Sequence, residues 1–318
     1  MTASGMKALV TGGAGFIGSH LSERLLDQGG EVVALDSFTD FYPRPLKERN
    51  LSGLIGRPGY RFVEGDIREV DLAALLEGVT HIFHLAAQAG VRRSWGAEFA
   101  IYTQLNIDST QRLLEACVGR PIERLVYASS SSVYGDDVEI PMTELALPQP
   151  VSPYGVTKLA AEQLCHLYHV NFGVPTVSLR YFTVYGPRQR PDMGFNRFFS
   201  AILAGKPLIQ FGDGLQTRDF TYVADAAAAT ATAAVRGVPG RVYNIGGGAR
   251  VSLREVFDLI ARVSGRPVTL DQQGPQKGDM RDTYADTSRA QADLGFAPSV
   301  TLEEGLRQMW RWMEATRT

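Results

Sequence analysis

A tyrosine and a lysine four positions apart are the residues of this chain best suited to moving a proton. Tyr154 and Lys158 lie in Ser-Pro-Tyr-Gly-Val-Thr-Lys, residues 152–158. Serine caps helices and proline suits a first helical turn, so we expect a helix to begin here with both side chains on one face. A free tyrosine, with a pKa of about 10, is a poor base at neutral pH, but a nearby ammonium group stabilises its phenolate. The pair therefore indicates acid–base chemistry; the alternative is an exposed helical turn with a chance Tyr and Lys.

A glycine-rich turn near the start of the chain predicts a dinucleotide site. Gly12, Gly15 and Gly18 follow a short β-type run and precede an apolar pattern of helical spacing. This spacing lets the backbone turn tightly, approach a pyrophosphate and pack helix against strand. A second strand ends at Asp36, about where an acidic residue accepts hydrogen bonds from an adenosine ribose. Asp36 would repel a 2′-phosphate, so we expect NAD rather than NADP; a structural glycine turn with a surface aspartate is the alternative.

Strand and helix patterns alternate through the first part of the chain and predict how these residues are positioned. This alternation is typical of an α/β fold with a doubly wound parallel Rossmann sheet. The expected strands are 7–10, 31–35, 60–63, 81–85, 124–128 and 176–179, with helices near 72–76 and 101–117. His84, inside an apolar strand, is interpreted as a satisfied core histidine.

Ligands of such sheets lie beyond the carboxyl ends of the strands, which selects particular residues. The serine run at residues 129–132 is expected near the reacting centre, where one hydroxyl would donate to a substrate oxygen in concert with Tyr154. The chain has no Gly-x-Ser-x-Gly elbow for a serine nucleophile. The residues expected to bind the cofactor are Gly12, Gly15, Phe16, Ile17, Gly18, Asp36, Asp66, Ile67, Leu85, Ala86, Ala87, Gln88, Tyr154 and Lys158.

The strict alternation loosens after residue 180, which predicts two domains. We place an NAD-binding Rossmann domain at residues 1–180, with a later segment near 220–248 returning to it. A smaller C-terminal α/β domain for the substrate would occupy residues 181–318. A second glycine cluster at residues 246–248 lacks the dinucleotide spacing and a trailing acid, so we interpret it as a loop.

Composition excludes several classes of function. The 318 residues carry a formal net charge of -2 without a basic block, which argues against nucleic-acid binding. No run of 18 apolar residues is present and the first residues lack an apolar signal-peptide region, so we expect a cytoplasmic protein without a membrane span. Cys117 and Cys165 fall in apolar helical patterns without metal-ligand spacing, so we expect reduced core residues and no metal site.

Seven features together resemble the extended short-chain dehydrogenase/reductase family of nucleotide-sugar enzymes, which includes the NAD-dependent epimerases and dehydratases. They are the strand ending at Asp36 and the motifs TGGAGFIGSH, HLAAQAG, ASSSSVYG, SPYGVTK, RYFTVYGPRQRPDM and GDGLQTRDFTYVAD. The similarity spans nearly the whole chain. Within the family it is strongest to the branch that acts on UDP-glucuronate, through HLAAQAGVR and FTVYGPRQRPDM.

The resemblance implies a catalytic triad of Ser130, Tyr154 and Lys158. Tyr154 would take the proton of the sugar 4-hydroxyl while C4 passes a hydride to NAD, and return of the hydride to the other face of the ketone would invert C4. Lys158 would hold the nicotinamide ribose and depress the tyrosine pKa. The implied substrate-binding residues are Ser130, Ser131, Tyr154, Thr183, Arg190, Arg218 and Asp279.

Differences from the motifs of related branches argue against two of the reactions that the family carries out, dehydration and decarboxylation. Dehydratases and UDP-glucuronate decarboxylases of this family carry an acid just after the triad serine, where this chain has Ser131 and Ser132. A 4-keto uronic acid loses carbon dioxide easily, and Arg190 could grip the carboxylate bidentately to prevent it; a solvated loop arginine is the alternative. Relatives often carry a phosphate-binding arginine where this chain has Gln276, with Lys277 and Arg281 as possible substitutes.

The resemblance also leaves several expectations about substrate and assembly. We expect C4 epimerisation of UDP-glucuronate with tightly bound NAD; UDP-glucose or UDP-N-acetylglucosamine is the alternative, followed by a decarboxylase or a non-catalytic NAD-binding protein. Thr283 stands where some relatives put a bulkier residue beside the sugar, which would widen the pocket. A homodimer is expected through the helices that contain Cys117 and Tyr154.

Overall fold

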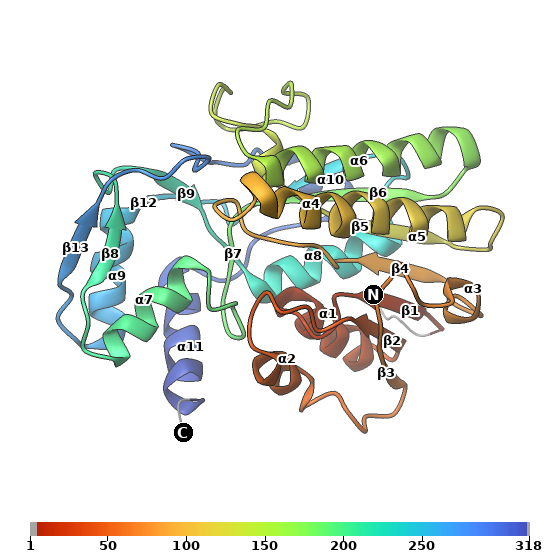
Figure 1. Ribbon diagram of the computed structural model, residues 1–318, viewed down its shortest axis with the longest axis horizontal. Helices are drawn as coiled ribbons and strands as arrows, with labels where there is room; N and C mark the ends of the chain where they lie inside the picture. Colours follow the sequence, from red (N-terminus) through yellow and green to blue (C-terminus); the bar gives the residue numbers. More distant parts are fainter. Residues whose placement is uncertain (1–4, 317–318) are drawn as a thin grey trace.

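A seven-stranded parallel sheet forms the centre of the protein, seen in a computed structural model that describes residues 5–316 (Figure 1). The strand order is β11-β6-β5-β4-β1-β2-β3, which reverses direction between β1 and β4. Ligands of open α/β sheets bind at this reversal. The predicted doubly wound sheet is confirmed. Its strands are β1 (Lys7–Thr11), β2 (Glu31–Asp36), β3 (Tyr60–Glu64), β4 (His81–His84), β5 (Arg124–Ser130), β6 (Thr176–Tyr181) and β11 (Val242–Ile245).

Helices cover both faces of this sheet because successive strand residues alternate between two cores. In β1, Ala8 and Val10 belong to one apolar cluster and Leu9 to the other. The first cluster includes residues of α1 (Phe16–Asp27) and α8 (Val223–Arg236), which lie on the same side in Figure 1. The second includes residues of α3 (Leu72–Leu75), α5 (Ser109–Cys117) and α6 (Pro153–Phe172).

The expected helix over residues 101–117 is interrupted, and the interruption has a function in packing. It comprises α4 (Phe99–Tyr102), a π-helical turn η2 (Thr103–Asp108) and then α5. The extra residue of a π turn brings buried Asn106 inward, where Oδ1 accepts from Gln88 N at 2.7 Å and Nδ2 donates to Thr157 Oγ1 at 2.9 Å. Asn106 thus ties the loop after β4 to α6.

A smaller lobe follows β6 and lies to one side of the sheet in Figure 1. β8 pairs in parallel with β13, β9 pairs antiparallel with β12, and α9 packs against α11. β11, by contrast, lies beside β6 in the large sheet, within the segment expected to return there. The remaining elements are α2 (Arg44–Leu51), η1 (Gly96–Glu98), η3 (Ser131–Val133), β7 (Val184–Tyr185), α7 (Gly194–Leu203), β8 (Leu208–Phe211), β9 (Thr217–Asp219), β10 (Thr221–Tyr222), β12 (Arg250–Ser252), α9 (Leu253–Ser264), β13 (Leu270–Gln273), α10 (Ser288–Leu294) and α11 (Leu302–Ala315).

Three residues predicted to be part of the core are found there. Cys117 and Cys165 are buried free thiols. His84 is buried, and its two ring nitrogens bond the hydroxyls of Thr11 at 2.8 Å and Thr110 at 2.9 Å, so the interpretation as a satisfied histidine is confirmed. Within residues 5–316, no helix combines the length and apolar character needed to cross a membrane.

Candidate active site

Tyr154 and Lys158 lie at the start of α6, in the helix that the sequence predicts. Ser152 Oγ accepts from Gly155 N at 3.1 Å, and Pro153 occupies the first helical position. Gly155 lies against the serine turn η3, because a Cβ there would come within 2.4 Å of the Ser132 carbonyl oxygen. The close approach fixes α6 relative to the carboxyl end of β5. Tyr154 and the serines are therefore held together by backbone packing.

Tyr154 lies where two cavities meet, and several neighbouring groups shift the pKa of its phenol. Burial raises its pKa above the ordinary value, while the Arg190 guanidinium and a hydrogen bond with Ser130 lower it. Arg190 is thus a cation that acts on this phenol, and the expected effect of Lys158 on the tyrosine pKa stays a prediction. The phenol is thus poised between Ser130, a hydrogen-bonding hydroxyl, and a guanidinium that favours its phenolate.

Lys158 is buried one turn further along the helix. Its Nζ lies 4.4 Å from the centre of the Tyr127 ring, and the residue is 3% exposed. Burial lowers the pKa of Lys158 to about 7, although Cys165 and Glu162 oppose that shift. Burial at the cavity wall thus disfavours the charged form of this lysine.

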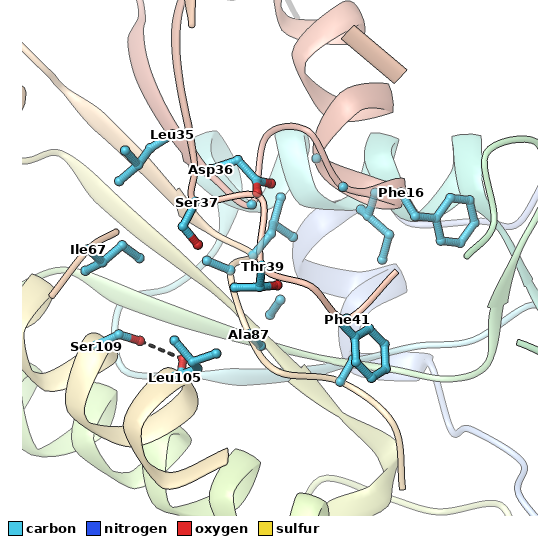
Figure 2. A pocket seen from close by; sticks show the side chains of 18 of the residues that line it. Phe16, Leu35, Asp36, Ser37, Thr39, Phe41, Ile67, Ala87, Leu105 and Ser109 are labelled. Atoms are coloured by element: carbon cyan, nitrogen blue, oxygen red, sulfur yellow. Dashed lines mark hydrogen bonds between the residues drawn. The ribbon is translucent and has the colours of Figure 1, made fainter. Parts of the chain in front are cut away.

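The first cavity runs along the carboxyl ends of β1, β2, β4 and β5 (Figure 2). Gly12 and Gly18 form its floor: Gly12 has φ +70°, and a Cβ at Gly18 would lie 2.2 Å from the Gly12 carbonyl oxygen. This bare backbone fits a pyrophosphate at the amino end of α1. The predicted residues that line it are Gly12, Gly15, Phe16, Ile17, Gly18, Asp36, Asp66, Ile67, Leu85, Ala86, Ala87, Tyr154 and Lys158.

Asp36 and Asp66 mark the end of the first cavity that is distant from Tyr154. Asp36 accepts from Ala14 N at 3.1 Å and Phe38 N at 2.9 Å, which orients its carboxylate and leaves acceptor capacity for ribose hydroxyls. Asp66 is held by Arg68, whose Nη2 lies 2.7 Å from Asp66 Oδ2 and keeps the pKa of Asp66 low. Both arrangements suit a neutral adenosine.

Gln88 is the expected cofactor residue that does not line this cavity. It is buried, and its backbone is held by both polar atoms of Asn106. Its place at a strand end predicted a ligand contact, but the π turn in η2 encloses it. Gln88 therefore supports the loop from behind, while its neighbours Ala87 and Ala89 line the cavity.

The second cavity, of about 890 Å³, lies between the sheet and the smaller lobe. This volume is within the range of about 300–1,000 Å³ typical of small-molecule sites. All the expected substrate residues line it: Ser130, Ser131, Tyr154, Thr183, Arg190, Arg218 and Asp279. Tyr154 and Arg190 also line the first cavity, so the two spaces meet at those side chains. Their roles in binding stay predictions.

Arg190 is fixed in place by two neighbours. Its Nε donates to Asp192 Oδ1 at 3.0 Å and its Nη2 to Asp192 Oδ2 at 2.9 Å. The guanidinium also lies over Phe41, 5.5 Å from the ring centre. Arg190 is thus an ordered cation in the cavity wall and not the solvated loop arginine that was the alternative.

Arg92, a residue that sequence reasoning missed, lies beside Arg218 and Asp279 in the wall of the second cavity. Arg92 donates from Nη2 to Asp279 Oδ2 at 2.6 Å and lies over Phe211, 4.2 Å from the ring centre. Arg92 lines the cavity with them. The signal was the Val-Arg that ends HLAAQAGVR, which places a cation in the segment after β4.

The substitutes considered for the missing family arginine lie elsewhere. Arg281 holds Asp213 in a surface pair with N–O distances of 2.8 and 2.9 Å, and neither Arg281 nor Lys277 lines the second cavity. Arg92 is therefore the better candidate for a phosphate. Thr283 is buried and does not line the second cavity, and its Oγ1 accepts from Asp219 N, so its effect on the width of the sugar pocket stays a prediction.

Comparisons with known proteins agree with this architecture. The model of a family described as the NAD dependent epimerase/dehydratase family matches residues 8–246. A protein named as an uncharacterized UDP-glucose epimerase, YtcB of Bacillus subtilis (strain 168), is 48% identical over 305 residues, 95% of this chain and 96% of its own. The UDP-glucuronate 4-epimerase of Thermodesulfobacterium geofontis (strain OPF15) is 37% identical over 308 residues, 96% of this chain and 95% of its own.

A solved structure resembles the present one closely. The UDP-glucuronic acid 4-epimerase from Bacillus cereus, crystallised with UDP-glucuronic acid and NAD, superimposes with a TM-score of 0.95 at 44% sequence identity. The match covers 98% of this chain and 99% of that one.

Proposed function

The chain belongs to the NAD-dependent epimerase/dehydratase family, and we propose that it interconverts UDP-glucuronate and UDP-galacturonate by inverting C4. The observation that carries the choice of substrate is Arg190, an ordered cation beside Tyr154 where the two cavities meet. A carboxylate on the sugar would find a planar partner there, next to the group that moves the proton.

NAD fits the first cavity because of its glycine floor and its acidic end. Gly12, Gly15 and Gly18 would meet the pyrophosphate, Asp36 the adenosine ribose and Lys158 the nicotinamide ribose. When bound, NAD supplies the chemistry of taking a hydride from C4 of the sugar and giving it back. The residues of the chain orient the sugar and handle the proton.

Tyr154 is proposed as the base for the 4-hydroxyl. Its phenolate takes the hydroxyl proton as C4 becomes a ketone, and returns a proton to the same oxygen after the ketone has turned over in the second cavity. Ser130 orients that oxygen through its own hydroxyl. The guanidinium of Arg190 supports this chemistry because it favours the phenolate against the effect of burial.

Retention of the substrate carboxylate distinguishes the proposed reaction from decarboxylation. The 4-keto form is a β-keto acid, which loses carbon dioxide when its carboxylate bond aligns with the carbonyl π-system. Ser131 and Ser132 provide no acid to assist that loss. Arg190 would hold the carboxylate bidentately in another orientation.

Three further expectations are part of the proposal. A homodimer through α5 and α6 is supported by exposed apolar side chains on α6, among them Leu167 and Val170, with exposed fractions of 49% and 64%. The division into an NAD-binding half and a substrate half is supported by the cavity between the sheet and the smaller lobe.

A cytoplasmic location agrees with two free cysteines and is checked by cell fractionation.

A second candidate is C4 epimerisation of UDP-glucose. Asp192 already neutralises Arg190, so the wall of the second cavity would also accept an uncharged sugar. The name of the YtcB relative points to the same substrate.

NMR of purified protein incubated with UDP-glucuronate, UDP-glucose or UDP-N-acetylglucosamine tests the proposal. We expect UDP-galacturonate from the first and little conversion of the other two. Arg190→Ala should then reduce turnover of UDP-glucuronate at least tenfold. A wild type that converts only UDP-glucose, with turnover indifferent to Arg190→Ala, would establish the second candidate.

A further inference from the structure

We propose that Asp192 is a positioning residue that determines which edge of the Arg190 guanidinium binds the sugar carboxylate. The edge that is used then determines whether the 4-keto form of the sugar keeps its carboxylate or loses it as carbon dioxide. The inference rests on the proposed function, because it concerns a uronic acid in the second cavity. Arg190 and Asp192 belong to the loop between β7 and α7, and both line that cavity.

The geometry leaves one edge of the guanidinium available. Asp192 takes the edge formed by Nε and Nη2, with N–O distances of 3.0 and 2.9 Å. A guanidinium has five N–H donors, so two bonds to Asp192 leave three, two on Nη1 and one on Nη2. Those three include a complete bidentate edge. A substrate carboxylate can therefore be held by two parallel hydrogen bonds without displacing Asp192.

Asp192 also makes one edge of the guanidinium more favourable than the other for a second carboxylate. Its negative charge repels a second carboxylate from the Nε side, while the Phe41 ring, 5.5 Å away, supports the plane of the guanidinium. The two side chains are 21% and 34% exposed, so water screens this repulsion only in part. The phenols of Tyr154 and Tyr42 and the ammonium of Lys47 also act on Arg190, and none of these groups competes as a carboxylate.

A fixed edge fixes the angle between the carboxylate and the ring of the sugar. If the carboxylate instead samples both edges, its bond to C5 can align with the C4 carbonyl. The C5–C6 bond then breaks, its electron pair forms the C4–C5 enolate, and C6 leaves as carbon dioxide. A solvent proton adds to C5, giving a UDP-4-keto-pentose that is released or reduced at C4 by the hydride already taken from the substrate.

Asp192→Asn tests the inference, because it keeps the shape of the side chain and removes the charge. Wild-type and variant holoenzymes are incubated with UDP-glucuronate, and NMR gives the ratio of pentose products, UDP-pentose plus UDP-4-keto-pentose, to UDP-galacturonate. We expect Asp192→Asn to raise this ratio at least fivefold. Asp192→Glu, which restores the charge on a side chain one methylene longer, should give a smaller rise. The ratio comes from a single sample, so a partly unfolded preparation does not alter it.

Asp213→Asn is the matched control. Asp213 also holds an arginine by two hydrogen bonds, from Nη1 and Nη2 of Arg281 at 2.8 and 2.9 Å, but this pair lies outside the lining of the second cavity. This variant should keep the wild-type product ratio. An unchanged ratio in Asp192→Asn, or an equal rise in Asp213→Asn, would overturn the inference. A wild type that forms no UDP-galacturonate would instead overturn the proposed function.

Discussion

Lys158, a residue of the proposed site, carries a cost to stability. A buried amine is destabilised in its charged form, and burial lowers the pKa of Lys158 from 10.5 to about 7. The unfolded chain therefore binds one more proton than the folded chain between about pH 7 and 10.5. Stability rises with pH across that window, because the penalty is complete below the folded pKa and disappears above the unfolded pKa.

Lys158→Met should stabilise the nucleotide-free protein near neutral pH while abolishing epimerisation. The gain is on the order of a few kcal/mol at or below pH 7 and should shrink toward zero by about pH 10. Thermal unfolding at pH 6, 7, 8, 9 and 10 measures the difference from wild type. Lys277→Met, at an exposed lysine outside both cavities, is the control and should show no such trend. A difference in Tm that stays constant with pH would contradict the explanation.

Individual site residues were predictable where a strand end or a family motif fixed them. Asp36, Tyr154 and Arg190 all reach the cavities expected for them. The partners of these residues were not predictable, because they come from distant parts of the chain. Arg92 meets Asp279 across 187 positions, and Phe41 packs under Arg190. The sequence contains no periodic signal for such pairs.

At the scale of elements, the contact between α6 and the serine turn η3 determines the distance from Tyr154 to Ser130. Gly155 permits this contact, since a Cβ would lie 2.4 Å from Ser132 O and 2.9 Å from the Pro150 side chain. Backbone atoms cannot yield as a flexible side chain can. The helix and the turn must therefore separate if a side chain is added there.

Gly155→Ala should lower epimerase turnover roughly ten- to a hundredfold, since about 1 Å of displacement costs on the order of 10²-fold. NAD content should change less, because the glycine turn that would hold the pyrophosphate is remote from this contact. Turnover and the NAD released on heating are the two measurements. Gly53→Ala is the control, because its Cβ would meet a neighbouring atom at an ordinary 3.6 Å. Equal losses in both variants would refute this account.

Helices and strands were largely predictable because apolar periodicity reports burial directly. The predicted strand over residues 124–128 appears as β5, Arg124–Ser130. The π turn was not predictable, since its residues keep helical character. The tertiary bonds of Asn106 accompany the wider turn, and its partners come from distant parts of the chain.

At the scale of the whole molecule, the outer face of α6 is the surface that we propose for contact with a second copy of the chain. Val156, Leu167 and Val170 recur at helical spacing with exposed fractions of 46%, 49% and 64%. In Figure 1, α6 and its neighbour α5 form the outer layer on one side of the sheet. Such an apolar stripe is suited to packing against the same helices of a second copy.

Val170→Asp should convert a dimer to a monomer by placing a charge in the proposed interface. Size-exclusion chromatography with light scattering at micromolar concentration gives the mass. Ile55→Asp changes a residue with a similar exposed fraction, 58%, beyond the end of α2, and should leave the mass unchanged. A wild type that elutes as a monomer, or a Val170→Asp variant that remains a dimer, would exclude this interface.

The π turn in η2 also restricts how the length of the chain can vary. One residue added to or removed from an α-helix rotates everything on one side by about 100°. A deletion within residues 103–108 would therefore turn Tyr102, whose hydroxyl donates to the carbonyl oxygens of Ala89 and Gly90, away from the loop after β4. An insertion would move Asn106 in the same way. Related chains that gain or lose residues are therefore expected to do so in surface loops rather than in this helix.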